Sequence, residues 1–113
     1  MSWIDLVSPE QLQEIRSESQ RSPVMIFKHS TTCNISAMAY HRLQRNSAPK
    51  IKTYYLDLRA YREISNLVES TFDVLHESPQ ILIIDKGEVV YHRSHGDINP
   101  SDIREFLEEK ATS

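Results

Sequence analysis

Short apolar runs alternate along the chain with longer segments in which apolar residues recur every three or four positions. Runs that are dense in apolar, β-branched or aromatic residues are typical of strands, and segments of the second kind are typical of helices with one buried face. We therefore predict strands at residues 3–7, 24–29, 53–58, 80–84 and 89–94.

Two places in this pattern carry further information about the sheet. Residues 24–29 are apolar enough to form a central strand. The segment Asp85-Lys86-Gly87-Glu88 is too short for a crossover, so the strands on either side of it must be antiparallel. Gly87 supplies the positive φ that such a tight turn needs.

The first helix is predicted to begin at Ser8. Ser8 can cap the helix, Pro9 suits the first helical position, and Gln11 occupies the third position of a capping box. The polar residues 16–22 are predicted to end this helix and to lead into the second strand.

A second helix is predicted to start near Ile35. Its apolar residues Ile35, Met38, Ala39 and Leu43 recur at spacings of three and four, so we expect them to form the face that packs on the core. The segment Ser47-Ala48-Pro49 breaks this pattern and should end the helix.

Two further helices are predicted at residues 61–72 and after Asn99. Asn99 can cap the last helix, and Pro100 suits its first turn. The residues expected on the buried faces are Ile64, Leu67, Val68 and Phe72 in the first of these helices and Ile103, Phe106 and Leu107 in the second.

These elements follow one another in the order β-α-β-α-β-α-β-β-α. Strands that are separated by helices require parallel crossovers, whereas the final hairpin adds an antiparallel strand. The helices must then cover both faces of one sheet. We therefore expect an α/β fold in a single domain, residues 1–113, with a central mixed sheet of four to five strands flanked by helices on both faces.

The composition limits the class of protein. The chain has 113 residues, of which 39% are apolar and 26% charged, as is typical of a soluble globular domain. A net charge of −3 without a basic patch argues against nucleic-acid binding, and no apolar run approaches the ~20 residues that span a bilayer. The lack of a signal-peptide pattern and the single cysteine favour the reducing cytoplasm. We expect a monomer.

The only cysteine, Cys33, is the strongest candidate for chemistry. It stands between a predicted strand and a predicted helix, where unpaired backbone N–H groups stabilise an anion such as a thiolate. The small polar residues 30–32 before it suit a solvated loop. Ser36 stands where a dithiol motif would carry its second cysteine, which indicates a thiol that attacks disulfides but cannot close one in its own motif. The alternative is that Cys33 is a structural residue, buried as a small apolar side chain.

Three short segments carry a resemblance to a known family. Thr32-Cys33-Asn34-Ile35-Ser36 looks like the TCPIS motif of the monothiol bacilliredoxins, the YtxJ-like family. The later segments His76-Glu77-Ser78-Pro79-Gln80 and Ser94-His95 are similar to two further motifs of that family, in the same order. The element order, with a cysteine after the second strand and a proline just before the fourth, resembles the thioredoxin fold over nearly the whole chain.

The resemblance implies a cytoplasmic thiol–disulfide oxidoreductase linked to bacillithiol, a low-molecular-weight thiol. Cys33 would be the nucleophile, and no cofactor would be tightly bound, because bacillithiol or a related small thiol acts as co-substrate. The partners would be client proteins that carry this thiol in a mixed disulfide. Since the chain has no second cysteine, the adduct on Cys33 must be resolved by a second small thiol or by another protein.

Residues on either side of Cys33 receive roles from the same resemblance. Thr32 is predicted to cap the helix or to touch the bound thiol. Asn34 stands where the family pattern has proline, so it restores an N–H near the sulfur and loosens the turn. Ser36 either donates its hydroxyl or backbone N–H to the thiolate or is an ordinary first-turn residue.

The resemblance also implies that the bond before Pro79 is cis and faces the cysteine, although only about one X–Pro bond in twenty is cis. Ser78 would then offer its backbone to the substrate. His76 and Glu77 would help to bind the polar small thiol, or they would simply be loop residues.

The histidines are dispersed, and no pair has the close spacing of a zinc site, so we expect no metal. His29 ends a predicted strand near the thiol. As a cation it would stabilise the thiolate, and otherwise it would leave the core for solvent. His95 is expected to pack behind the loop.

Three functions stay open at this point. The first is the oxidoreductase. The second is a non-catalytic binding module of thioredoxin fold with a structural cysteine. The third is a redox sensor in which Cys33 is modified without turnover.

Overall fold

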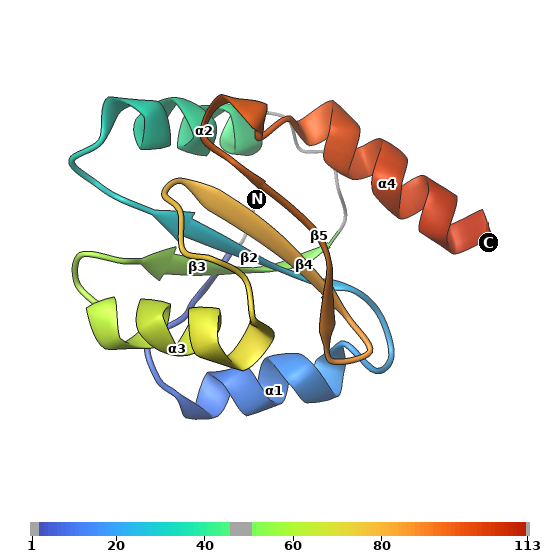
Figure 1. Cartoon of the computed structure of the whole chain (residues 1–113). Helices are drawn as coiled ribbons and strands as arrows, with labels where there is room; N and C mark the ends of the chain where they lie inside the picture. Colours follow the sequence, from blue (N-terminus) through green and yellow to red (C-terminus); the bar gives the residue numbers. More distant parts are fainter. Residues whose placement is uncertain (1–2, 46–50, 113) are drawn as a thin grey trace.

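One sheet with helices on both faces makes up the protein (Figure 1). The computed structural model describes residues 3–45 and 51–112, and within these residues the sheet has five strands in the order β1-β3-β2-β4-β5. The strands are β1 (Ile4–Asp5), β2 (Val24–His29), β3 (Lys52–Asp57), β4 (Gln80–Asp85) and β5 (Glu88–Ser94). The predicted central position of the second strand is confirmed.

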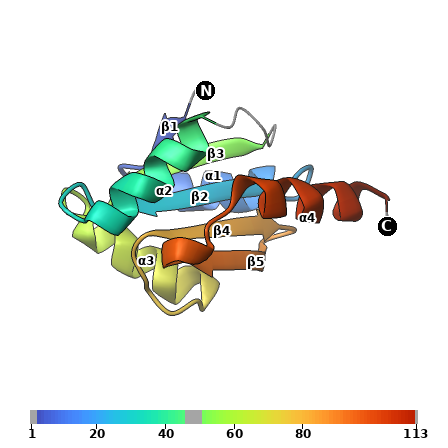
Figure 2. The same ribbon diagram turned by 90° about the horizontal axis from the view of Figure 1, so that it is seen from above.

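The helices lie in two layers. The helix α1 (Glu10–Glu18) and the helix α3 (Arg62–Phe72) cover one face of the sheet, and the helices α2 (Asn34–Arg45) and α4 (Pro100–Thr112) cover the other (Figures 1 and 2). A short 3₁₀ helix, η1 (His95–Asp97), joins β5 to α4. The predicted element order and the predicted mixed sheet are therefore confirmed.

Strand pairing follows the predicted topology. β1 and β2 both pair parallel to β3, whereas β4 pairs antiparallel to β2 and to β5. The hairpin between β4 and β5 turns through Lys86 at φ 53° and Gly87 at φ 79°, as a two-residue turn of this hand requires. β1 is shorter than predicted, because only Ile4 and Asp5 pair with β3.

The sheet separates two apolar cores. Alternation along β2 sends Val24 and Ile26 into the core under α1 and α3, and Met25 and Phe27 into the core under α2 and α4. Because β2 is covered on both faces, it is buried along its whole length.

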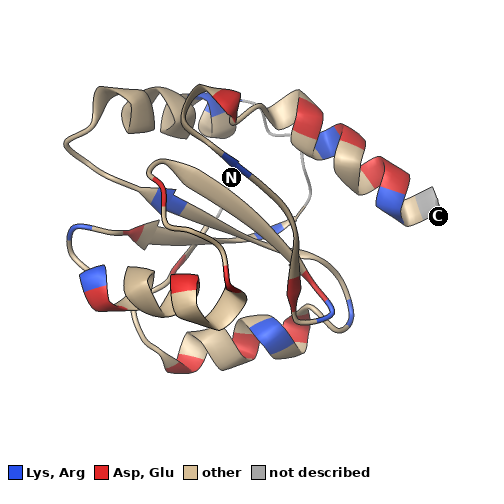
Figure 3. Cartoon of the chain, viewed as in Figure 1, with Lys and Arg blue, Asp and Glu red and all other residues tan. Residues whose placement is uncertain are grey.

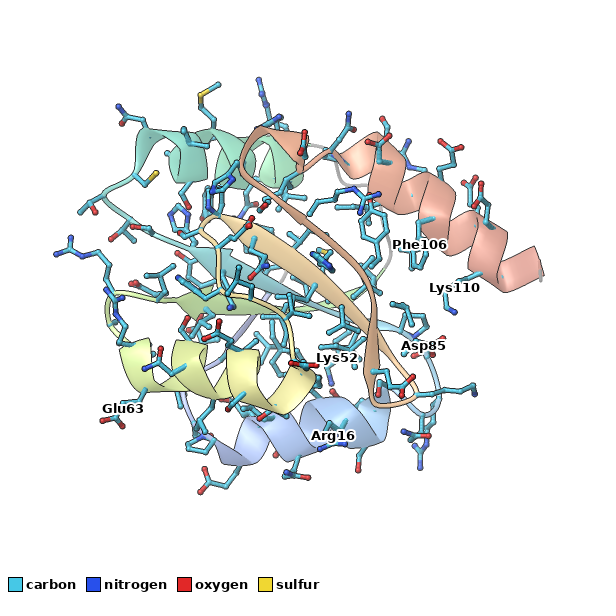
Figure 4. All side chains as sticks on the ribbon, in the orientation of Figure 1. Arg16, Lys52, Glu63, Asp85, Phe106 and Lys110 are labelled. Atoms are coloured by element: carbon cyan, nitrogen blue, oxygen red, sulfur yellow. The ribbon has the colours of Figure 1, made fainter. Side chains whose placement is uncertain are left out.

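The second half of α4 contacts the hairpin of β4 and β5, in the right half of Figure 4. The ammonium of Lys110 lies 2.9 Å from the carboxylate of Asp85, and the ring of Phe106 packs 4.7 Å from the ring of Tyr91. Asn99 caps the start of this helix by accepting a hydrogen bond of 2.8 Å from the backbone N–H of Ser101, as predicted.

The helix α1 differs from its prediction at its start, where Pro9, not Ser8, is the capping residue. The predicted capping-box contact of Gln11 is present, because its side chain accepts a hydrogen bond of 3.0 Å from the backbone N–H of Ser8. The helix ends at Glu18, within the polar residues that were predicted to end it. The Glu18 carboxylate accepts a hydrogen bond from the Tyr54 hydroxyl at 2.7 Å, so the end of the helix contacts the sheet.

The predicted buried face of α2 is confirmed at Ala39 and Leu43 and wrong at Ile35 and Met38. Ile35 and Met38 are 49% and 63% exposed, whereas Ser36, Ala39 and Leu43 face the core. The helix is rotated about its axis relative to the prediction, because Ser36 in its first turn is buried and its hydroxyl contacts His29 and Ser30. In α3 and α4 the error is smaller, since Leu67 is exposed and Phe106 and Leu107 are only half-buried. The predicted break at residues 47–49 lies outside the described residues.

Candidate active site

Cys33 lies where the chain passes from β2 into α2. Its carbonyl accepts the first helical hydrogen bond, from the N–H of Ala37 at 3.0 Å, and its own N–H donates to the carbonyl of Ser30 at 3.2 Å. The side chain is half-buried and belongs to neither apolar core. The predicted placement of Cys33 at a helix start is confirmed.

Ser36 is fully buried behind the Cys33 loop. Its hydroxyl oxygen accepts a hydrogen bond from the N–H of Ser30 at 2.9 Å and lies 2.8 Å from Nδ1 of His29. The predicted donation of this hydroxyl to the thiolate is therefore replaced by contacts with Ser30 and His29. Ser36 fixes the loop that carries the sulfur, and the role of its backbone N–H stays a prediction.

His29 does not leave the core for solvent as predicted. It is only 7% exposed, and its ring packs against the rings of Phe27, Tyr40 and Tyr55. Burial lowers the pKa of His29, and the nearby carboxylate of Asp57 offsets this only in part. The neutral imidazole is favoured, so His29 acts on the loop through its hydrogen bond with Ser36 and not as a cation beside the thiolate.

Thr32 and Asn34 flank the cysteine on the solvent side. Both residues are exposed, and Asn34 is the first residue of α2. Because the carbonyl of Cys33 accepts the first helical bond, Thr32 precedes the capping position that it was predicted to occupy. Contact of Thr32 or Asn34 with a bound thiol stays a prediction.

Pro79 lies at the same edge of the sheet as the Cys33 loop. Lys28 pairs with Gln80 in the antiparallel register of β2 and β4, so Pro79 stands beside the end of β2. The Ser78–Pro79 bond is cis, which confirms the implication of the resemblance. Pro79 is buried, Ser78 is half-buried, and the Pro79 carbonyl accepts a hydrogen bond of 3.0 Å from the N–H of His95.

His76 turns its ring into the protein. Its Nδ1 lies 3.2 Å from the Lys28 ammonium and 3.3 Å from the Ser65 hydroxyl, and its backbone N–H donates to the Glu69 carboxylate at 2.9 Å. Burial, more than the neighbouring Lys28, lowers the pKa of His76. These contacts anchor the segment before Pro79, so the predicted contact of His76 with the small thiol would use other atoms than Nδ1.

Glu77 connects the segment before Pro79 to β5 and to His95. The Ser94 hydroxyl donates a hydrogen bond to its carboxylate, and Nδ1 of His95 lies 3.9 Å from that carboxylate. His95 itself is exposed, with a φ of 54°, and does not pack behind the loop as predicted. The Pro79 segment is therefore held by α3 and β2 through His76 and by β5 through Glu77.

Lys28 is the residue that the sequence analysis missed. It is fully buried on β2, and burial lowers its pKa to about 8 although Glu69 acts in the opposite direction. The signal in the sequence was a charged residue inside an otherwise apolar central strand, VMIFKH. Such a residue is rarely buried unless it has a partner, and here the partner is His76 beside the candidate site.

Neither a metal centre nor a membrane span emerges from residues 3–45 and 51–112. These residues contain no cluster of three or more His, Cys, Asp or Glu side chains that could hold a metal ion. In the same part of the chain, no helix is long and apolar enough to cross a bilayer.

Comparison with known proteins identifies the family. The family model described as monothiol bacilliredoxin BrxC matches residues 4–103. The chain belongs to the monothiol bacilliredoxin family. The matched range includes Cys33, Ser36 and the segment from His76 to Pro79, and the family that the sequence resembled is confirmed.

Similar solved structures establish the fold of this bacilliredoxin family member. A structure described as an oxidoreductase with a thioredoxin fold is 36% identical, with 90% of each chain covered and a TM-score of 0.76. Thioredoxin from Trypanosoma brucei brucei is 18% identical, covers 99% of this chain and 93% of its own, and has a TM-score of 0.76. Thioredoxin from Malassezia sympodialis is 17% identical over 96% and 90% of the two chains, at a TM-score of 0.72.

These findings fix the general activity. The two thioredoxins, at their low identity, show the fold alone, whereas the family and the 36% identical oxidoreductase also bear on chemistry. The chain is a thiol–disulfide oxidoreductase of thioredoxin fold.

Proposed function

We propose that the protein reduces mixed disulfides between client proteins and bacillithiol, or a similar low-molecular-weight thiol, with Cys33 as the nucleophile. The observation that carries this proposal is the position of Cys33. The only sulfur of a cysteine in the chain is partly exposed at the start of α2, at the sheet edge where the Pro79 segment leads into β4. A thiol sealed in either core could not reach a protein disulfide.

The reaction is a thiol–disulfide exchange without net oxidation in its first step. The Cys33 thiolate attacks the small-thiol sulfur of the mixed disulfide, a bond forms between these two sulfurs, and the client thiolate leaves and takes up a proton. A second small thiol, as thiolate, then attacks the small-thiol sulfur of the adduct. This releases the Cys33 thiolate and a disulfide of two small thiols, because the chain has no second cysteine to close a disulfide on Cys33.

The surrounding residues support this role in three ways. Ser36 and His29 hold the loop from behind, so the position of the sulfur is set by buried hydrogen bonds. Thr32 and Asn34 are exposed beside it and would contact the small thiol. Ser78 would offer backbone groups to the substrate from the Pro79 segment. In this proposal the small thiol is a co-substrate in the cytoplasm, and no cofactor is resident.

The proposal is tested with a client protein that carries bacillithiol on a single cysteine. Mass spectrometry of the wild type should detect bacillithiol on Cys33 and the free client, and added bacillithiol should give several turnovers. Cys33→Ala should give neither product. A wild-type protein that accepts bacillithiol once and never turns over would be the redox sensor instead.

Alkylation separates the enzyme from the non-catalytic binding module. Iodoacetamide should label Cys33 in the native protein, and the rate should rise with pH as the thiolate forms. Labelling that begins only when urea unfolds the protein would mean a structural cysteine, and the proposed function would then fail.

A further inference from the structure

The helix that follows Cys33 has an outward face that the described residues leave uncovered. Ile35 and Met38 are 49% and 63% exposed, and His41 and Arg45 are exposed further along. At 3.6 residues per turn, these four side chains leave the helix within a sector of about 120°. We call Ile35, Met38, His41 and Arg45 the α2 outer face.

The α2 outer face is hollowed between its apolar start and its basic end. A shallow depression of about 510 Å³ is lined by Met38, His41, Arg42 and Arg45. The flexible thioether of an exposed methionine adapts to apolar partners of different shape, and an arginine guanidinium pairs with carboxylates. The depression therefore suits an apolar side chain that stands next to an acidic one.

The charge of α2 sets it apart from the other helices. α2 contains Arg42 and Arg45 and neither Asp nor Glu, whereas α1, α3 and α4 all carry acidic residues (Figure 3). The whole chain has a net charge of −3. The rest of the chain is therefore more acidic than the chain as a whole, and a partner with acidic residues is steered toward α2.

The length of the α2 outer face favours a polypeptide over a small thiol. Arg45 stands twelve positions after Cys33, which is about 18 Å along a helix axis. A small thiol bound at Cys33 does not span this distance. A polypeptide does, with about five extended residues for the axial distance and a few more because Arg45 lies about 120° round the helix from Cys33. A client protein has its chain on either side of the modified cysteine, so it can occupy Cys33 and the depression together.

We propose that the α2 outer face is the docking surface for the client protein and that it selects clients with apolar and acidic residues beside the modified cysteine. This inference rests on the proposed function, because the mixed disulfide is what brings the client to Cys33. Small disulfides that lack such a segment react without using this surface.

Binding is tested without chemistry by NMR. The probe is a short synthetic peptide with leucine and aspartate on both sides of a serine, titrated into ¹⁵N-labelled Cys33→Ala protein. The amide shifts should concentrate at residues 35–45, and Arg45→Glu and Met38→Ser should each reduce them. Shifts elsewhere, or equal shifts with a peptide that has lysine in place of aspartate, would overturn the proposal. Shifts that follow protein concentration alone would assign the face to a second copy of the chain and also overturn it.

Kinetics test whether docking serves the reaction. The probe is the same peptide with cysteine in place of serine, disulfide-bonded to bacillithiol, and the measurement is the single-turnover rate of transfer to Cys33. Arg45→Glu should lower this rate about tenfold at low salt. The control is Arg21→Glu, which makes the same charge change at an exposed residue three positions after the end of α1, a helix on the opposite face of the sheet from α2 (Figure 1). An equal loss in the control would refute specific docking.

A second substrate separates this inference from the proposed function. With the disulfide of two bacillithiol molecules, Arg45→Glu and Met38→Ser should react like the wild type, because no client segment is present. A wild type that reacts with neither substrate would contradict the proposed function. In that case the NMR titration would still decide whether the α2 outer face binds an apolar, acidic segment.

Discussion

Replacing Lys28 by methionine should stabilise the protein at neutral pH and remove a pH dependence from its stability. Lys28 is fully buried on β2, and its ammonium lies 3.2 Å from Nδ1 of His76. Burial lowers the pKa of Lys28 to about 8, and Glu69 compensates only in part. Methionine has nearly the same length and carries no charge that must be desolvated.

The magnitude follows from the shift of the pKa of Lys28 on folding. The ordinary value of 10.5 applies to the unfolded chain, and the folded value is about 8. This difference corresponds to about 3 kcal/mol of destabilisation at pH values below the folded pKa. Between the two pKa values the unfolded chain binds a proton that the folded protein has lost, so the free energy of unfolding rises with pH. About 2 kcal/mol of the penalty should disappear between pH 7 and pH 9.5.

The variant also loses the hydrogen bond between Lys28 and His76, which contributes about 1 kcal/mol. The Lys28→Met protein should therefore be more stable than the wild type by about 2 kcal/mol at pH 7. At pH 9.5 this advantage should shrink by about 2 kcal/mol. His76 does not disturb the comparison, because its pKa is lowered and it is neutral at both pH values.

The assay is urea denaturation of both proteins at pH 7 and at pH 9.5. The free energies of unfolding are compared as variant minus wild type at each pH, so that the titration of all other groups cancels. A difference that stays the same at the two pH values would show that Lys28 titrates in the folded protein as it does in the unfolded chain. A variant that is less stable at pH 7 would show that the ammonium is better paired than its desolvation allows, and either result would refute the reasoning.

Substitutions at three further positions test the start of α2 and the turn between β4 and β5. Asn34→Pro should raise the melting temperature and add ~0.4–1 kcal/mol to the free energy of unfolding, and a clear loss would reveal a partner for the Asn34 N–H. Ser36→Ala should lower the free energy of unfolding in urea by ~1–3 kcal/mol, because the N–H of Ser30 and the buried Nδ1 of His29 lose their partner; an unchanged midpoint would contradict this. Gly87→Ala should lower thermal stability by about 1 kcal/mol, because φ is 79° there although the added Cβ has room. Gly87→Asn should lose less, since asparagine tolerates a positive φ.

The fold could be predicted from the sequence because its signals are local. Each strand that was predicted has a dense apolar run, and the hairpin has a turn whose Gly87 fits a positive φ. The main error, the exposed face of α2, occurs where hydrogen bonds of a polar side chain decide the outcome. Ser36 is buried with its hydroxyl in contact with Ser30 and His29, and the hydropathy pattern does not reveal those contacts.

The candidate site was predicted only in part, for the same physical reason. Cys33 could be found from its neighbours in sequence, and the cis bond before Pro79 followed from family resemblance alone. The partners of Lys28 could not be found, because His76 comes from a loop 48 positions later. A polar side chain can be buried only where tertiary structure brings hydrogen-bond partners to it, and a hydropathy pattern carries no information about these partners.

The rotation of α2 about its axis determines both the exposure of Ile35 and Met38 and the position of the Cys33 sulfur. At about 100° per residue, the buried face centred on Ser36, Ala39 and Leu43 lies about 90° from the direction of Cys33. The face predicted from hydropathy, which includes Ile35 and Met38, would lie about 145° away and would aim Cys33 at solvent. Burying the Ser36 hydroxyl therefore brings the sulfur to the border between core and solvent, consistent with its half-burial. The same rotation leaves Ile35 and Met38 outside, so the hydrogen bonds that position the nucleophile also create the surface that we assign to the client protein.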